Sequence, residues 1–263
     1  MSDSHPGLNL SKTFLNKSKS DPTKEIFTQG YTIISKLISQ KECQKLTDDL
    51  DLIRGKWPYH IEGNDSYAGV FRSPFIFFNS YRDLLLNKII SDYLDEIFPC
   101  NYQLHLSRCV ENKPTEIAAT AEWHRDIPYL HTPSTYPISI SALTFLSDIS
   151  EIQIEILKNS NASSFYDLNL QETIMMNPKV GDVLLFDSNL VHRTLPTSKR
   201  VVYNLYMYSS PVIKPVVSYS SKSIKELISE NNYRIEDLNK VIGYEYLIPP
   251  DDEIYMSKKL IDK

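Results

Sequence analysis

The feature of this sequence that most restricts its fold is a series of short strand-like segments in the middle of the chain. The segments are YQLHLSRCV, ISISALTFL, EIQIEIL, GDVLLFD and VVYNLYMY. They are rich in β-branched and aromatic residues, and clusters of Pro, Asn, Ser and Gly separate them. In EIQIEIL the isoleucines alternate with Glu and Gln, as in a strand with one buried face. Consecutive strands without helical patterns between them predict an antiparallel sandwich or barrel.

Helical patterns lie on both sides of this strand-rich region. Ser39 and Glu42 have the S-x-x-E spacing of a capping box, and apolar residues follow them at helical spacing. A second helix is predicted over residues 81–97. Ser223 and Glu226 repeat the capping-box spacing near the C-terminus. This order of elements predicts the α+β class, with a mainly β core.

The chain divides into a short arm and one large domain. Residues 1–24 are rich in Ser, Lys and Pro, which favours a flexible N-terminal arm. With 263 residues and 41% hydrophobic content, the remainder is ample for a single large domain. We expect that domain to span residues 25–263, with its β core over about 100–210 and a C-terminal helix and tail over 211–263.

The composition disfavours several classes of partner. The net charge is −5 and no basic block occurs, so nucleic acid and anionic membranes are poor candidates. No run of 18 apolar residues and no secretory signal are present. Cys43, Cys100 and Cys109 are widely spaced, which is typical of free thiols in a reducing compartment. We therefore expect a cytoplasmic protein, as a monomer or a homodimer, that acts on a small molecule.

The segment EWHRDIPY places a histidine two positions before a carboxylate. In an extended chain His124 and Asp126 point to the same side, so both can reach one metal ion. A solvated polar loop is the alternative, because such a pair often arises by chance. His192 follows GDVLLFD, after enough chain to return beside the pair, although a strand-end histidine without a metal would look the same. Two histidines and one carboxylate form the facial triad of non-haem Fe(II) sites, which leaves positions open for a cosubstrate and O₂.

Arg200 stands at the entrance of the strand VVYNLYMY. Counting by two, it shares a face with Val202, Asn204 and Tyr206. A cosubstrate with a distal carboxylate needs a planar, permanently charged fork, which arginine supplies better than lysine. Thr194 can add a hydroxyl donor to the same carboxylate. The alternative is a surface arginine in a polar turn.

Together these motifs resemble the phytanoyl-CoA dioxygenase family. The resemblance rests on WHRD, on GDVLLFDSNLVH, on the threonine two residues later and on the arginine that opens a strand. It runs from about residue 27, where FTQGYTIISKLIS is similar to the family's opening strand and helix, to about residue 208. It implies a double-stranded β-helix, a jelly-roll or cupin-like fold, with flanking N-terminal and C-terminal helices. It also implies an oxygenase that uses Fe(II), 2-oxoglutarate and O₂.

The resemblance assigns roles to individual residues. It makes iron ligands of His124, Asp126 and His192. It makes Arg200 and Thr194 the binding site for the distal carboxylate of 2-oxoglutarate.

The substrate side of the site is less defined. Arg108, in HLSR, is similar to a position that some family members use to reach the substrate. Tyr129 follows the His-Asp pair and is expected either to form a wall of the substrate site or to pack within a loop.

The expected activity is hydroxylation of a C–H bond of a small metabolite or natural-product intermediate, with release of succinate and CO₂. Asp126 favours this outcome, because related halogenases leave the carboxylate position vacant. The alternative is a cupin-like protein that either lacks catalysis or binds metal without using 2-oxoglutarate. The chain departs from the family at SDISEIQIEILKNSNASS, which lacks the glycine and histidine of many members. The spacing from His192 to Arg200 is also short, which makes Arg193 a second candidate anchor.

Overall fold

The computed structural model describes residues 21–54, 59–60, 67–76, 78–98, 102–114, 122–126, 137–147, 154–162, 172–196, 198–210 and 219–220. Structural statements below concern these residues. Most of the expected N-terminal arm and the helix expected from Ser223 lie outside them, as does Tyr129.

The described chain begins with a capped helix and an edge strand. Helix α2 (Pro22–Gln29) starts with a proline in its first turn, and the Asp21 side chain accepts hydrogen bonds from the first backbone N–H groups. Gly30 ends the helix with a φ of 87°, a left-handed conformation that glycine adopts without steric cost. The chain then turns directly into strand β1 (Tyr31–Ile34).

Helix α3 (Gln40–Ile53) confirms the first capping box. The Ser39 side chain accepts from the Glu42 N–H, and the Glu42 side chain accepts from the Ser39 N–H. Leu46 and Leu50 of this helix are buried against the sheet, as the apolar spacing predicts.

The single helix predicted over residues 81–97 is wrong. The structure has two helices there, α4 (Asn79–Leu85) and α5 (Lys88–Ile97). Asn87 separates them, because its side chain accepts hydrogen bonds from the N–H groups of Ile89 and Ile90 and so caps a new helix. The apolar spacing continues across the break, which is why periodicity alone does not reveal it.

A large antiparallel sheet forms the centre of the fold. Its strands besides β1 are β2 (Tyr59–His60), β3 (Tyr67–Arg72), β4 (Gln103–Asn112), β5 (Ser139–Phe145), β8 (Val183–Asp187), β10 (Val201–Ser209) and β11 (Tyr219–Ser220). Their order is β1-β8-β5-β10-β4-β3-β2, with β11 also paired to β4. The predicted strand segments correspond to β4, β5, β8 and β10 in this sheet, and to β6 in a second sheet.

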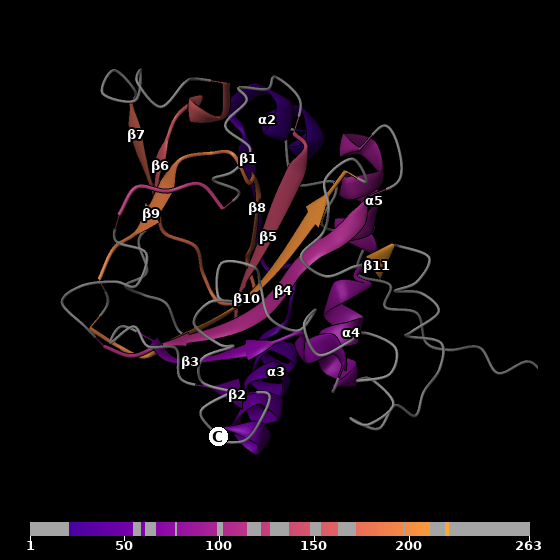
Figure 1. The fold of residues 1–263 in the computed structure, drawn as a ribbon, viewed down its shortest axis with the longest axis vertical. Coiled ribbons are helices and arrows are strands. Elements are labelled where there is room, and N and C mark those ends of the chain that lie inside the picture. The colour runs from indigo at the N-terminus through magenta and orange to yellow at the C-terminus, as the bar shows by residue number, and fades with distance from the viewer. Residues whose placement is uncertain are drawn as a thin grey trace, which may run out of the picture.

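The second sheet is smaller and has the order β7-β6-β9. It consists of β6 (Ile154–Leu157), β7 (Thr173–Met176) and β9 (His192–Thr194). Two 3-10 turns, Pro74–Ile76 and Ser160–Ala162, complete the described elements. Figure 1 shows the small sheet on one side of the large sheet and helices α4 and α5 on the other. Two antiparallel sheets with flanking helices confirm the prediction of an α+β fold with a β core.

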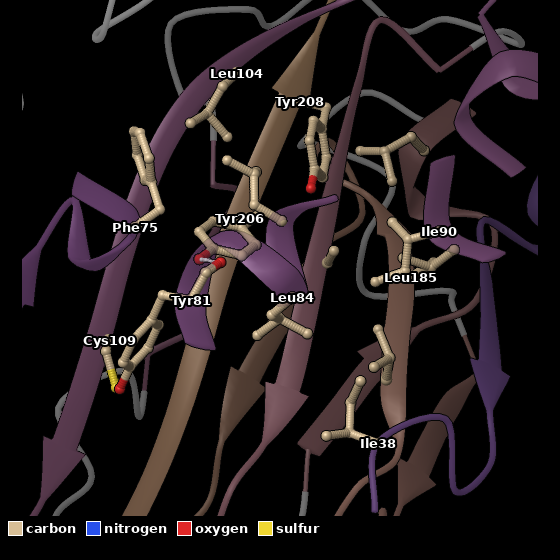
Figure 2. Packing of buried hydrophobic residues seen from close by; sticks show 14 of the residues in the cluster. Ile38, Phe75, Tyr81, Leu84, Ile90, Leu104, Cys109, Leu185, Tyr206 and Tyr208 are labelled. Atoms are coloured by element: carbon tan, nitrogen blue, oxygen red, sulfur yellow. Dashed lines mark hydrogen bonds between the residues drawn. The ribbon is translucent and has the colours of Figure 1, made fainter. Parts of the chain in front are cut away.

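Alternation along the central strands divides the interior into two apolar layers. On β10, Val202, Tyr206 and Tyr208 belong to the cluster under the helices, whereas Tyr203 belongs to the cluster between the sheets. Figure 2 shows Tyr81 of α4 packed against the strand that carries Tyr206. The Tyr206 hydroxyl donates to the Tyr81 carbonyl oxygen at 2.8 Å, so a buried polar group is satisfied. The layer between the sheets is the one that contains the candidate site.

Candidate metal centre

A cavity that is partly open to solvent lies between the two sheets. Its wall is mainly apolar, with side chains from β5, β6, β8 and β10. The described lining residues are Arg108, His124, Asp126, Leu143, Phe145, Ile154, Ile156, Leu184, Phe186, His192, Thr194, Tyr203 and Leu205. Six of these thirteen residues are polar or charged, and polar groups that converge on an apolar wall are typical of small-molecule sites.

The structure brings His124, Asp126 and His192 together in this cavity. One ligand atom from each lies within 4.8 Å of the others. His124 and His192 form a β-bridge, in which each backbone N–H donates to the other's carbonyl oxygen at 3.0 Å. The segment that carries the His-Asp pair therefore continues the small sheet beyond β9. Sheet pairing, rather than sequence proximity, fixes the distance between the two imidazoles.

Both imidazoles are oriented by backbone carbonyl groups. The Nδ1 atom of His124 lies 2.9 Å from the Glu122 carbonyl oxygen, and Nδ1 of His192 lies 2.9 Å from that of Leu190. A carbonyl oxygen only accepts, so each Nδ1 carries the proton and donates it. The Nε2 lone pairs are then available for a metal ion, an arrangement common at metal-bound histidines.

The Asp126 carboxylate is fixed by a chain of buried serines. The Ser141 hydroxyl donates to Oδ2 of Asp126 at 2.6 Å. Ser188 lies within hydrogen-bond distance of both Ser141 and Ser139, at 2.9 and 3.0 Å, and Ser139 donates to the Tyr208 carbonyl oxygen. Oδ1 of Asp126 remains on the side of His192, 3.7 Å from its Nε2. The carboxylate therefore presents one oxygen to the centre and uses the other for support.

Arg125, between the two candidate ligands, points away from them. Its guanidinium donates to the carbonyl oxygen of Asn189 in the β8–β9 turn, and the side chain is buried. The carboxylate of Asp187, the last residue of β8, accepts from the Asn189 N–H and from the Asn161 amide. Burial raises the pKa of Asp187 to about 6, and Arg125 counteracts part of that rise. Arg125 thus ties the His-Asp segment to the turn that leads into His192.

Burial also sets the protonation of His192. It lowers the pKa of this imidazole, while the Asp126 carboxylate opposes the shift. The neutral form that results is the form that binds metal ions.

Of the residues expected to bind cosubstrate or substrate, Thr194 and Arg108 line the cavity. Tyr203, which the sequence motifs do not single out, lines it as well. Ser141 is a further polar neighbour that was not predicted. The signal for it is the pair of serines at alternate positions of an otherwise apolar strand, Ser139 and Ser141.

The structure places Arg200 away from the cavity. The face shared with Val202, Asn204 and Tyr206 is the helix side of the large sheet, whereas the cavity receives Tyr203 and Leu205. Arg200 instead donates to the buried Glu111 carboxylate, lies 3.5 Å from Asp51, and is exposed. Its role as the 2-oxoglutarate anchor is corrected for this reason: the counting by two is right, but that face is turned away from the site.

Arg193 is also directed elsewhere. Its Nε donates to Glu155 at 2.5 Å, and its guanidinium lies 4.4 Å from the ring centre of Trp123. Trp123 therefore stacks on an arginine of the small sheet.

Comparison with known proteins agrees with this architecture. Residues 27–152 match the family model of phytanoyl-CoA dioxygenase (PhyH), a span that includes His124 and Asp126 but ends before His192. No curated protein matches the chain in sequence. Among the helices that the structure describes, none is long and apolar enough to cross a membrane.

Several solved structures have the same fold. The epimerase SnoN from nogalamycin biosynthesis has a TM-score of 0.60 and 13% identity, covering 72% of this chain and 82% of its own. The carbocyclase SnoK from the same biosynthesis has a TM-score of 0.62 and 15% identity, covering 75% and 86%. HygX from Streptomyces hygroscopicus, with nickel, 2-oxoglutarate and hygromycin B bound, has a TM-score of 0.56 and 14% identity, covering 74% and 88%. The match over residues 27–152 and the shared fold confirm that the chain resembles the phytanoyl-CoA dioxygenase family, as its sequence motifs predict.

Proposed function

We propose that this protein is an Fe(II)- and 2-oxoglutarate-dependent oxygenase that hydroxylates a C–H bond of a small molecule. The observation that carries the proposal is the convergence of His124, Asp126 and His192 at one cavity between the sheets. The family match and the fold of SnoN, SnoK and HygX support it. SnoN and SnoK are themselves α-ketoglutarate-dependent non-haem enzymes.

The donor set suits Fe(II). Two imidazoles with exposed Nε2 atoms and one carboxylate would supply three ligands to the ion and offset part of its charge, whereas structural zinc sites usually close around four ligands. The carbonyl groups of Glu122 and Leu190 hold the imidazoles in the tautomer that exposes Nε2. Fe(II) with 2-oxoglutarate supplies O₂ activation coupled to decarboxylation, with release of succinate and CO₂.

The residues of this chain have two tasks around that chemistry. His124, Asp126 and His192 would hold the metal at the cavity wall. The apolar side chains of β5, β6 and β8 exclude water and offer a surface for a hydrocarbon portion of the substrate. A small molecule is favoured over a polymer because the site is a largely apolar cavity between the sheets rather than an exposed basic groove.

Anaerobic titration of the metal-free protein with Fe(II) and then 2-oxoglutarate tests the proposal. The expected result is a visible metal-to-ligand charge-transfer band in the wild type. Asp126→Ala removes one of three ligands, so we expect it to weaken metal binding strongly and to abolish the band. Asp92→Ala, at an exposed carboxylate that pairs with Lys88 on α5, is the matched control and should behave as the wild type.

Three results distinguish the alternatives. Fe(II) binding without any response to 2-oxoglutarate would indicate a cupin-like metal protein that does not use this cosubstrate. Absence of Fe(II) binding by the folded wild type would indicate a non-catalytic β-barrel. A charge-transfer band without substrate-stimulated succinate release across a panel of small metabolites would support binding of metal and 2-oxoglutarate. It would refute oxygenase activity on those compounds.

A further inference from the structure

One positive charge lines the cavity among the residues that the structure describes. It belongs to Arg108 of β4, on the strand that lies beside β10. Arg108 is directly opposite Leu205, whose side chain also lines the cavity, so the two project from the same face of the sheet. The side chain is half-buried, and its Nε atom is shielded from solvent.

The surroundings of Arg108 suit a carboxylate. The neighbouring cavity wall contains Leu143 and Leu205, and an ion pair is stronger beside such apolar groups than in water. A guanidinium binds a carboxylate through two parallel N–H donors, which gives direction as well as energy.

Hydroxyl groups lie within the same cavity. Tyr203 is opposite Val110, two residues from Arg108 on the same face, so Tyr203 and Arg108 are diagonal neighbours. Thr194 enters the cavity from β9 in the small sheet. Both side chains can donate to an anion held by the guanidinium.

Arg200 is committed to a different function. It shares the Glu111 carboxylate with Arg54, the residue that follows α3, and the Glu111 side chain is only 2% exposed. A buried carboxylate needs such cations, because an isolated buried charge is strongly destabilising. Arg200 therefore helps to join α3 to the outer face of the large sheet.

We propose that Arg108 anchors the carboxylate of 2-oxoglutarate that lies farthest from the metal, with Tyr203 and Thr194 as supporting donors. This inference rests on the proposed function and names the residue that would make the site selective for a dicarboxylate. The cosubstrate would then have its metal-binding end at the His-Asp-His cluster and its distal carboxylate at Arg108, which line the same cavity. The same guanidinium could instead receive an anionic group of the substrate, and the experiment separates these two sources of a carboxylate.

The test compares 2-oxoglutarate with 2-oxopentanoate, which has the same chain but lacks the distal carboxylate. Dissociation constants are measured anaerobically on the Fe(II)-loaded protein from the charge-transfer band. We expect Arg108→Gln to weaken 2-oxoglutarate binding by about 30-fold or more, the range for truncating one partner of a buried charge pair. Binding of 2-oxopentanoate should change little, so the preference of the wild type for the dicarboxylate should disappear.

Two further variants provide the controls. Arg108→Lys keeps the charge but loses the fork, so it should restore part of the preference. Arg200→Gln should leave both dissociation constants within about 3-fold of the wild type, because Arg54 still pairs with Glu111. Unchanged Fe(II) affinity and an unchanged circular dichroism spectrum in Arg108→Gln would show that the variant is folded.

The outcomes are distinguishable. The inference is overturned if Arg108→Gln retains the wild-type preference, or if Arg200→Gln loses it. It is also overturned if Arg108→Gln binds 2-oxoglutarate normally and loses only the response to substrate, since the guanidinium would then hold the substrate. If the wild type binds Fe(II) but neither oxo acid, the proposed function itself fails, before any variant is considered.

Discussion

His124 and His192 exchange both of their backbone hydrogen bonds, so two candidate ligands from distant parts of the chain are paired like residues of adjacent strands. Their ring centres lie 4.4 Å apart, and the Asp126 carboxylate joins them from the same short segment. The geometry of the centre therefore depends on the small sheet and on the groups that hold its neighbours.

Ser141→Ala should weaken metal binding without unfolding the protein. The Ser141 hydroxyl donates to Oδ2 of Asp126, and its loss lets the carboxylate rotate away from the centre. Loss of such a supporting hydrogen bond typically costs 10- to 100-fold in metal affinity. Anaerobic calorimetric titration with Fe(II) measures this directly. Ser91→Ala on α5, where the hydroxyl contacts Tyr102, is the control. Equal affinities for the two variants would show that Ser141 does not position Asp126.

Arg125→Ala should destabilise the fold far more than Arg193→Ala. Arg125 is buried and its guanidinium donates to the Asn189 carbonyl oxygen, so its removal leaves a buried acceptor unpaired and costs roughly 2–3 kcal/mol of the free energy of unfolding. Arg193 is partly exposed and pairs with Glu155, an interaction worth about 1 kcal/mol or less. Urea denaturation measures both. Similar losses for the two variants would contradict the tethering role of Arg125.

Gly181→Ala should be severely destabilising. Gly181 has a φ of 82°, and a Cβ there would lie 2.0 Å from the Ile38 carbonyl oxygen. That distance is a steric clash with a backbone atom. The backbone must move, at a cost of about 3 kcal/mol or more. Gly30→Ala is the control, since its φ is 87° but the nearest atom is the Leu190 side chain at 3.0 Å, which can adjust. Thermal unfolding of the two variants should therefore differ clearly, and equal melting temperatures would refute the steric explanation.

His105 should make the protein sensitive to acid. Burial lowers the pKa of His105 from 6.5 to about 4, so the unfolded chain takes up a proton that the folded chain excludes between these two values. The free energy of unfolding should therefore fall as the pH drops from 6.5 to 4, by about 3 kcal/mol from this residue.

Asp187 acts in the opposite direction, because its raised pKa adds stability as the pH falls through about 6. The difference between the wild type and His105→Gln isolates the histidine. It should be largest at pH 7 and shrink towards pH 4 in urea denaturation. A difference that does not vary with pH would show that His105 is not the group responsible.

Local rules account for much of what could be predicted. The capping box at Ser39 predicts where α3 begins, and the strand patterns predict β4, β5, β6, β8 and β10, because both depend on neighbouring residues. The break at Asn87 was missed because apolar periodicity continues through it, and β7 and β9 are too short to show a period.

In the site, too, features that depend on local sequence could be predicted and features that depend on packing could not. His124, Asp126 and His192 could be singled out by residue type and spacing, and the structure brings them together. Counting by two correctly predicts that Arg200 shares a face of β10 with Val202 and Tyr206. Only the packing of helices against that face shows that it is not the cavity side. Arg108 lies on another strand, and its relation to the centre depends on strand order, which no local pattern contains.

The segment with two of the candidate ligands is held to the third, and to the turn before it, by four hydrogen bonds. Asp126 N–H donates to the Ser188 carbonyl oxygen, Arg125 donates to that of Asn189, and His124 pairs with His192. A centre held in this way exists before any ion arrives, so little conformational entropy remains to be lost on binding. Metal binding should then cause little structural change. Amide hydrogen exchange around the cavity should be slow in the metal-free protein and change little when the ion binds.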